Sequence, residues 1–315
     1  MNLRILQKRV VAYNFSDVGL PTKNLEVAFA NVRGKNLKIT DYGKIMKYPD
    51  LEDVVVVNLP WDILRTVFLE LPPVPKEQDR LNLAAIEIKR LYDFISDVEV
   101  ALLPSVGGKQ LAIFVEKTDL NRYLSTINIG IEPDVAYPDL FSELLLVQKF
   151  PGYWVYFIMG KAVSGTVLMF GDMILNIRIH EMALNTVDRI VLEETGFELC
   201  EIEKSENSEL IERAEKIVES LIGELITEAE REVIITVNTT DVEKVAIDQI
   251  EGVVFLANSK IISNSLLSTE YEGFLRRKLT SPSLKIDIPK DISLSIAGLL
   301  YRGGLEFGKV KSLSW

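Results

Sequence analysis

The sequence predicts an α/β protein of two lobes, each a mixed sheet with a three-stranded meander and flanking helices. The chain of 315 residues, with 48% hydrophobic and 26% charged residues, is long enough for two globular domains. Runs of short apolar strands occur twice, over residues 9–42 and 153–179, and helix-linked strands follow each run. This repeated order predicts two lobes of the same kind.

The first half of the chain carries clear strand and helix patterns. The valine run 54–57 is typical of a strand buried on both faces, whereas the alternation over 61–71 is typical of a half-exposed strand. Pro75, Thr118-Asp119 and Pro138-Asp139 are helix-start signals. The expected strands are 9–15, 25–33, 36–42, 54–57, 61–71, 98–103 and 110–116, and the expected helices are 75–95, 118–130 and 138–147.

The second half opens with three apolar runs, separated by short loops that begin at Gly160 and Gly171. Glycine in such breaks is typical of tight hairpins, so we expect an antiparallel meander. A helix should stop at Gly196, and a longer helix with one apolar and one glutamate-rich face should begin at Ser208. The expected strands are 153–159, 162–170, 173–179, 232–237, 252–256 and 284–286, and the expected helices are 184–195, 208–229, 266–279 and 292–300.

Composition excludes several classes of function. A formal net charge of -11 without a lysine or arginine cluster argues against nucleic-acid binding. Cys200 and His180 are each the only residue of their type, which excludes an intramolecular disulfide and any triad or zinc site that needs more than one imidazole or thiolate. No apolar run reaches the roughly 18 residues of a spanning helix, so we expect no membrane span. The single cysteine is typical of a reducing compartment, so we expect a cytoplasmic protein. No metal site is expected.

A meander followed by helix-linked strands is the repeating unit of actin-like (ribonuclease H-like) folds, in which two lobes enclose a nucleotide. The segment 54–71 places Asn58-Leu59-Pro60 and Leu69-Glu70-Leu71-Pro72 on either side of Arg65. This pattern resembles the PilM family and the cytoplasmic part of GspL, which are actin-like assembly proteins of type IV pili and type II secretion. Later elements follow in the family's order, so the resemblance spans most of the chain.

The resemblance implies a domain organisation. Residues 1–150 would form the first actin-like lobe, with an inserted subdomain at about 73–137. Residues 151–290 would form the second lobe, because Pro151-Gly152 precedes the second meander. The C-terminal helix and tail, 291–315, would return to the first lobe.

Three loops that hold the nucleotide in actin-like ATPases depart from the expected pattern here. Asp17-Val18-Gly19 has the letters of the first phosphate turn, but the following Pro21 has no N–H to donate. At the second loop, residues 157–160 supply no carboxylate for a metal-bound water. At the adenosine turn, 257–259 replaces the usual glycine pair with side chains.

These departures predict a non-catalytic scaffold without a cofactor and without catalytic residues. The alternative is an ATP-binding PilM-like protein with weak or no hydrolysis, which would hold ATP with Mg²⁺ through Asp17, Gly19 and Lys23. A sugar-kinase-type enzyme of the same superfold is a third possibility, and the missing second carboxylate argues against it.

The resemblance also implies partners: the cytoplasmic tail of a bitopic, PilN-like inner-membrane protein, or a secretion ATPase. The protein would then be cytoplasmic and peripheral to the inner membrane through its partner. Guanidinium groups and tyrosines are common anchors of peptide recognition. The predicted partner-binding residues are Arg90, Tyr92, Lys117, Arg122 and Tyr123, and the acidic face of helix 208–232 is the alternative interface.

Overall fold

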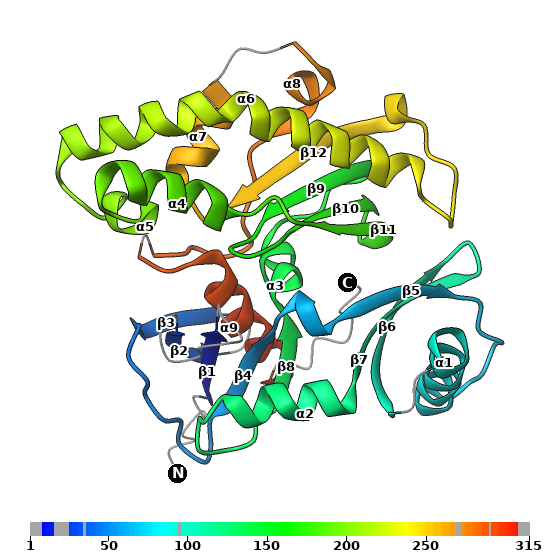
Figure 1. The fold of residues 1–315 in the computed structure, drawn as a ribbon. Helices are drawn as coiled ribbons and strands as arrows, with labels where there is room; N and C mark the ends of the chain where they lie inside the picture. The colour runs from blue at the N-terminus through cyan, green and yellow to red at the C-terminus, as the bar shows by residue number, and fades with distance from the viewer. Residues whose placement is uncertain are drawn as a thin grey trace. The chain divides into compact units, whose positions relative to one another are not determined.

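The computed structural model of the chain describes residues 8–15, 25–33, 36–93, 96–268, 272–289 and 291–307. The chain divides into two compact units. Unit 1 comprises residues 1–146 and 294–315, and unit 2 comprises residues 147–293 (Figure 1).

The main sheet of unit 1 consists of β1 (Lys8–Phe15), β2 (Leu25–Arg33), β3 (Asn36–Gly43), β4 (Val54–Leu59) and β8 (Val135–Pro138). The strand order is β3-β2-β1-β4-β8, with β1, β2 and β3 antiparallel and β4 and β8 added in parallel. The predicted meander over 9–42 and the buried valine strand are confirmed. β8 was not predicted, because four residues carry too little periodicity to identify a strand.

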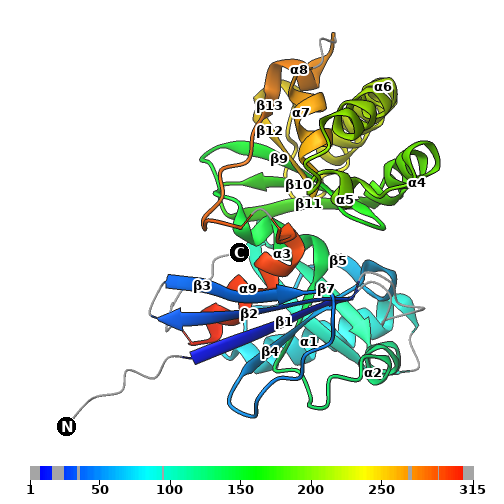
Figure 2. The same cartoon turned by 90° about the vertical axis from the view of Figure 1, so that its left-hand side faces the viewer.

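Helix α9 (Leu294–Phe307) returns the chain to unit 1, where it packs on β1, β2, β4 and α3 (Asp139–Leu146) (Figure 2). Glycines allow this close approach. A Cβ atom on Gly298 would lie 2.1 Å from the carbonyl oxygen of Ser142, and one on Gly303 would lie 2.5 Å from Val10 Cγ1. The predicted C-terminal helix is confirmed, and it extends beyond residue 300 to Phe307.

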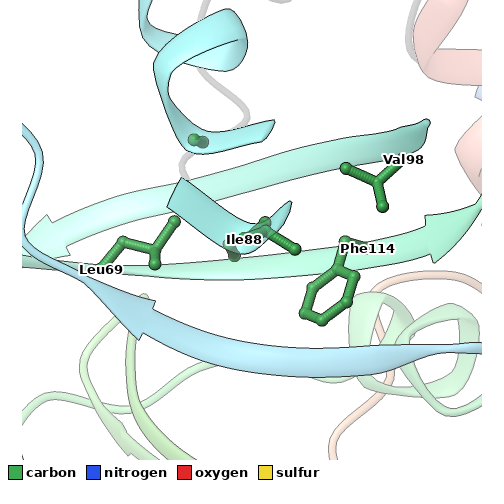
Figure 3. Close-up of a cluster of buried hydrophobic side chains, with 6 residues drawn as sticks. Leu69, Ile88, Val98 and Phe114 are labelled. Atoms are coloured by element: carbon green, nitrogen blue, oxygen red, sulfur yellow. The ribbon is translucent and has the colours of Figure 1, made fainter. Parts of the chain in front are cut away.

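A second layer of unit 1 is a three-stranded sheet of order β5-β7-β6, with α1 (Glu77–Tyr92) packed on β6. Its strands are β5 (Arg65–Leu69), β6 (Val98–Val106) and β7 (Lys109–Glu116), and α2 (Lys117–Thr126) follows directly. Leu69, Ile88, Val98 and Phe114 belong to the buried cluster that joins the helix to the sheet (Figure 3).

Two predictions for this layer were wrong in extent. The inserted layer begins at Arg65 rather than at residue 73, and residues 135–138 belong to the main sheet. The strand expected over 61–71 is divided, because residues 61–63 form a 3-10 helix (η1, Trp61–Ile63) with Trp61 buried. A turn of 3-10 helix followed by a short strand can give the same alternation of apolar and polar residues in the sequence as one longer strand.

Unit 2 contains a five-stranded sheet of order β11-β10-β9-β12-β13. The strands are β9 (Tyr153–Met159), β10 (Ser164–Phe170), β11 (Met173–His180), β12 (Ile250–Ala257) and β13 (Leu279–Thr280). The helices are α4 (Leu184–Thr195), α5 (Leu199–Ile202), α6 (Ser208–Asn238), α7 (Lys260–Ser268) and α8 (Phe274–Lys278), with a 3-10 turn η2 (Ile247–Gln249). The predicted meander and the stop at Gly196, which has φ of 80°, are confirmed.

Residues 232–237 were predicted as a strand and instead form the last part of α6. The run is rich in β-branched residues, which favour strands locally, but Val233, Thr236 and Val237 place one buried face at helical spacing. The single helix expected over 266–279 is two shorter helices, α7 and α8. At the expected strand 284–286, Leu284 forms an isolated bridge with Val147.

Candidate functional site

The first candidate site consists of the three loops that correspond to the nucleotide-binding loops of actin-like ATPases. Asp17, Gly19 and Lys23 lie outside the described residues. At the second loop, the carbonyl oxygen of Gly160 accepts from the N–H of Leu184 at 2.9 Å, and that of Lys161 accepts from the N–H of Asn185 at 3.0 Å. The hairpin loop therefore packs on the start of α4, and these backbone groups are already paired.

The third loop, between β12 and α7, is occupied by a carboxylate of the same unit. Glu203 Oε1 accepts from Ser259 Oγ at 2.7 Å and from the N–H of Ile261 at 2.9 Å, while Ser259 Oγ accepts from the N–H of Ile262 at 3.2 Å. The first amides of a helix are the groups that bind an external anion. Here Glu203 and Ser259 already pair two of them.

We expect Glu203→Ala to destabilise the start of α7. The variant removes one charge-assisted hydrogen bond to a backbone amide and one to Ser259, a loss of about 1.5–3 kcal/mol. Hydrogen exchange should show faster exchange of the Ile261 amide. Glu206→Ala, at an exposed position of the same linker, is the matched control. Unchanged exchange in Glu203→Ala would show that the carboxylate does not hold the helix.

A buried polar cluster lies in unit 1, beneath the predicted partner segment. Asn58 is fully buried, and its side chain both donates to and accepts from the Phe15 backbone at 2.9 Å. Tyr123 donates to Asn58 Oδ1 at 3.1 Å and is only 3% exposed. This hydrogen bond fixes α2 to β4. The predicted partner role of Tyr123 is wrong in this structure, because its side chain is not accessible.

Two buried carboxyl groups stand one turn apart on α3. Burial raises the pKa of Asp139 to about 8, while a hydrogen bond with Asn58 acts in the opposite direction. Burial also raises the pKa of Glu143 to about 7, against a hydrogen bond from Ser295 Oγ. One oxygen of each carboxyl has no hydrogen-bond partner among the described residues. Asp139 therefore favours the protonated state at neutral pH, and Glu143 is divided between its protonated and charged states there.

The other predicted partner residues are accessible, and they come from two helices of unit 1. Arg90 of α1 pairs with Glu87 at 2.6 Å, and the Tyr92 ring lies 5.3 Å from that of Phe114. On α2, ion pairs of 3.0 Å join two basic side chains to acidic neighbours: Lys117 to Glu99, and Arg122 to Asp119. The side chains of Arg90 and Arg122 are 73% and 76% exposed. Their role in partner binding stays a prediction.

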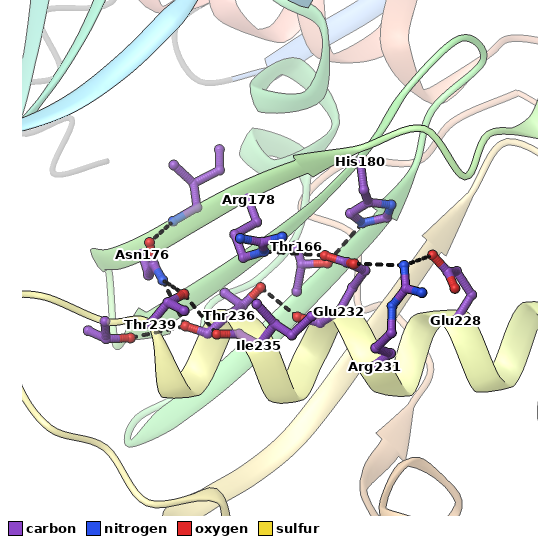
Figure 4. A network of polar contacts seen from close by, with 12 residues as sticks. Thr166, Asn176, Arg178, His180, Glu228, Arg231, Glu232, Ile235, Thr236 and Thr239 are labelled. Carbon is purple, nitrogen blue, oxygen red and sulfur yellow. Dashed lines mark hydrogen bonds and ion pairs between the residues drawn. The ribbon is translucent and has the colours of Figure 1, made fainter.

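A polar network in unit 2 joins α6 to the meander (Figure 4). Glu232, buried on α6, accepts from Arg178 Nε and from Arg231 Nη2, each at 3.3 Å. His180 Nε2 lies 3.0 Å from Thr166 Oγ1, and burial lowers the pKa of His180 to about 4. The only histidine is therefore neutral at physiological pH, and its contacts fasten β11 to β10.

No protein-family profile and no curated protein matches the chain. Among solved structures, the chain is similar to one described as "PilM-PilN type IV pilus biogenesis complex". That similarity has a TM-score of 0.58 at 15% identity and covers 95% of this chain and 99% of the other. The actin-like fold predicted from the sequence is confirmed.

Two further solved structures show weaker likenesses to the chain. The cytoplasmic domain of EpsL, from the type II secretion system of Vibrio cholerae, gives a TM-score of 0.37 at 13% identity, covering 58% of this chain and 75% of that one. The ethanolamine utilization protein EutJ from Carboxydothermus hydrogenoformans gives a TM-score of 0.43 at 9% identity, covering 93% of this chain and 89% of that one.

None of the described helices is long and apolar enough to cross a membrane.

Proposed function

We propose that the chain is a non-catalytic, actin-like adaptor at the cytoplasmic side of a type IV pilus or type II secretion platform in the inner membrane. The fold similarity to a chain of the PilM–PilN complex supports this role. The observation that carries the proposal is the internal carboxylate at the start of α7, since Glu203 satisfies backbone and hydroxyl donors at the adenosine turn.

The charge of Glu203 also matters for nucleotide binding. A phosphate brought near this turn would meet a carboxylate rather than free amides, and like charges at short range repel. The turn residues 257–259 also carry side chains where a purine would approach the backbone. ATP binding through Asp17, Gly19 and Lys23 would therefore have to proceed without the usual contribution of this loop.

The proposed partner is the cytoplasmic tail of a bitopic, PilN-like membrane protein, and a secretion ATPase is the second candidate. The name of the similar complex pairs PilM with PilN, which favours the tail. Arg90 and Arg122 project their guanidinium groups into solvent, and among the described residues each pairs with an acidic residue three positions away on its own helix. Surface pairs of this kind contribute little to stability, so these groups can be redirected to a partner at small cost.

We expect the double variant Arg90→Glu/Arg122→Glu to lose co-purification with the partner's tail at unchanged thermal stability. Arg213→Glu/Lys216→Glu on α6 is the matched control, because those side chains are 60% and 70% exposed. If the α6 variant alone loses co-purification, the interface lies on the acidic helix instead.

A titration of the unaltered chain with a fluorescent ATP analogue and Mg²⁺ should show no saturable binding. Micromolar binding would favour the ATP-binding alternative.

A further inference from the structure

Glu143 is a carboxylic acid in an otherwise apolar contact between α3 and α9. Every residue of α3 from Leu140 to Leu146 is buried, and Glu143 itself is 3% exposed. On α9, four apolar residues have no exposed surface: Ile296, Ala297, Leu299 and Leu300. The carboxyl group is therefore separated from solvent for as long as the first turns of α9 stay on α3.

Two hydrogen bonds that involve Ser295 join the first turn of α9 to α3. The Ser295 hydroxyl donates to Glu143 Oε1, and the Ser295 carbonyl oxygen accepts from Ser142 Oγ at 3.2 Å. The other carboxyl oxygen of Glu143, Oε2, is buried and has no hydrogen-bond partner among the described residues. An ionised carboxylate needs donors at both oxygens, so this arrangement suits the protonated acid.

The charged groups around Glu143 do not neutralise it. Glu26 of β2 raises the pKa of Glu143 further, and Glu143 and Asp62 of η1 raise the pKa of Asp139, one turn earlier on α3. Glu26 accepts from Asn14 Nδ2 at 2.9 Å and from the Tyr42 hydroxyl at 2.8 Å, which favours its charged form.

The basic residue of α9 is Arg302, and its guanidinium group lies 5.4 Å from the centre of the Tyr137 ring. Within the described ranges, no basic side chain forms an ion pair with Glu143. A negative charge at this position would therefore be buried among other acids without a cation beside it.

We infer that Glu143 is a proton-dependent latch, which holds the start of α9 on α3 while it is protonated and releases it on losing the proton. Separation of the first turn of α9 from α3 admits water to both carboxyl oxygens, so the charged form favours the open arrangement. The later turns of α9 are held separately, because Gly303 lies against Val10 and Val56. The release is therefore confined to the start of the helix.

The latch lies where the chain changes unit. The chain leaves unit 1 after Leu146, close to Glu143 on the same helix, and re-enters unit 1 at Leu294, next to Ser295. Proton loss by Glu143 therefore loosens the point at which the returning chain is attached to unit 1. The protonation state of one buried acid thus regulates this attachment.

The direction of the pH effect follows from the two arrangements of α9. Burial raises the pKa of Glu143 from 4.5 to about 7 while α9 is in place, and exposure to water in the open arrangement restores the ordinary value. Opening therefore releases a proton between these two values, and the opening constant rises with pH until it levels off above the higher one. From pH 5.5 to pH 8 it should rise roughly thirtyfold.

The test is hydrogen exchange of the full chain, followed by mass spectrometry from pH 5.5 to pH 8. Opening constants are corrected for the intrinsic pH dependence of amide exchange. The peptide that contains Gly298 and Leu299 should show the rise, because the main-chain hydrogen bonds of α9 begin there. Glu143→Gln keeps an acceptor for Ser295 and cannot lose a proton, so the rise should disappear. A peptide around Gly223 of α6, in unit 2, should not show it in either chain.

Asp139→Asn is the matched control, because it removes the neighbouring carboxyl group and leaves Glu143 in place. The rise should persist in this variant. Ser295→Ala provides a second test, because it removes a donor that lowers the pKa of Glu143, and the midpoint of the rise should move to higher pH.

A rise that persists in Glu143→Gln, or that is lost in Asp139→Asn, would overturn the inference. An unmoved midpoint in Ser295→Ala, or pH-independent opening in the unaltered chain, would also overturn it. The assay contains neither a protein partner nor a nucleotide, so its outcome is independent of the proposed adaptor role.

Discussion

Gly298→Ala is expected to destabilise unit 1 by about 3 kcal/mol or more. The added Cβ would lie 2.1 Å from the carbonyl oxygen of Ser142, a backbone atom that cannot rotate away. Either α9 must shift from α3 or the backbone of α3 must move. Because Ser142 also donates its hydroxyl to the carbonyl oxygen of Ser295, a shift of the helix would stretch this second contact as well.

The same substitution elsewhere provides a direct control. Gly223 lies within α6, and a Cβ there would meet no atom within 4 Å. Gly223→Ala should therefore stabilise the helix by about 1 kcal/mol, the difference in helix propensity between the two residues. Denaturant unfolding of both variants, followed by hydrogen exchange in each unit, would measure the contrast. Equal stability of Gly298→Ala and the unaltered chain would contradict the packing of α9 described above.

Unit 1 should become less stable as pH rises from about 4 to about 8. Asp139 and Glu143 have pKa values raised to about 8 and about 7, so in this window the folded state holds protons that the unfolded state has released. Stability is fully present below the pKa of the unfolded carboxyls and is lost as pH rises through the folded values. Each group can contribute a slope of up to about 1.4 kcal/mol per pH unit.

Asp139→Asn removes one of these titrations and tests this pH dependence. The variant should be more stable than the unaltered chain at pH 8, by on the order of 3 kcal/mol, and its stability should depend less on pH. Urea unfolding at pH 5.5 and pH 8 measures both effects. Glu132→Gln, at an exposed position, is the control for loss of a carboxylate. An unchanged pH slope in Asp139→Asn would show that Asp139 is charged in the folded protein.

Elements with strong local patterns could be predicted from the sequence. The meander of β9, β10 and β11 could be predicted because Gly160 and Gly171 separate strongly apolar runs. The end of α4 could be predicted because glycine is favoured there, and Gly196 has positive φ in the structure. The C-terminal extension of α6 was missed, because its identity depends on which face packs against β10 and β11. Tertiary packing overrides local propensity there.

The site residues were harder to predict, because their roles come from partners distant in the chain. Glu203 contacts Ser259 and Ile261, more than fifty positions later, and nothing in the local pattern marks it among many glutamates. Tyrosine is a common recognition residue, but the Tyr123 hydroxyl donates a buried hydrogen bond to Asn58 inside the lobe. Asp139 follows Pro138 as an ordinary helix start, and its hydrogen bond with Asn58 joins it to a strand much earlier in the chain.

The return of α9 to unit 1 has a consequence for the order of events on the ribosome. Residues 147–293 are continuous, so unit 2 can fold as soon as it has emerged. Most of unit 1 emerges before unit 2 but stays incomplete, because the α9 residues that cover Val10 and Val56 are made only after unit 2. During synthesis the sheet of unit 1 exposes apolar surface for the time needed to translate all of unit 2. This interval is the point at which the nascent chain most needs protection from aggregation.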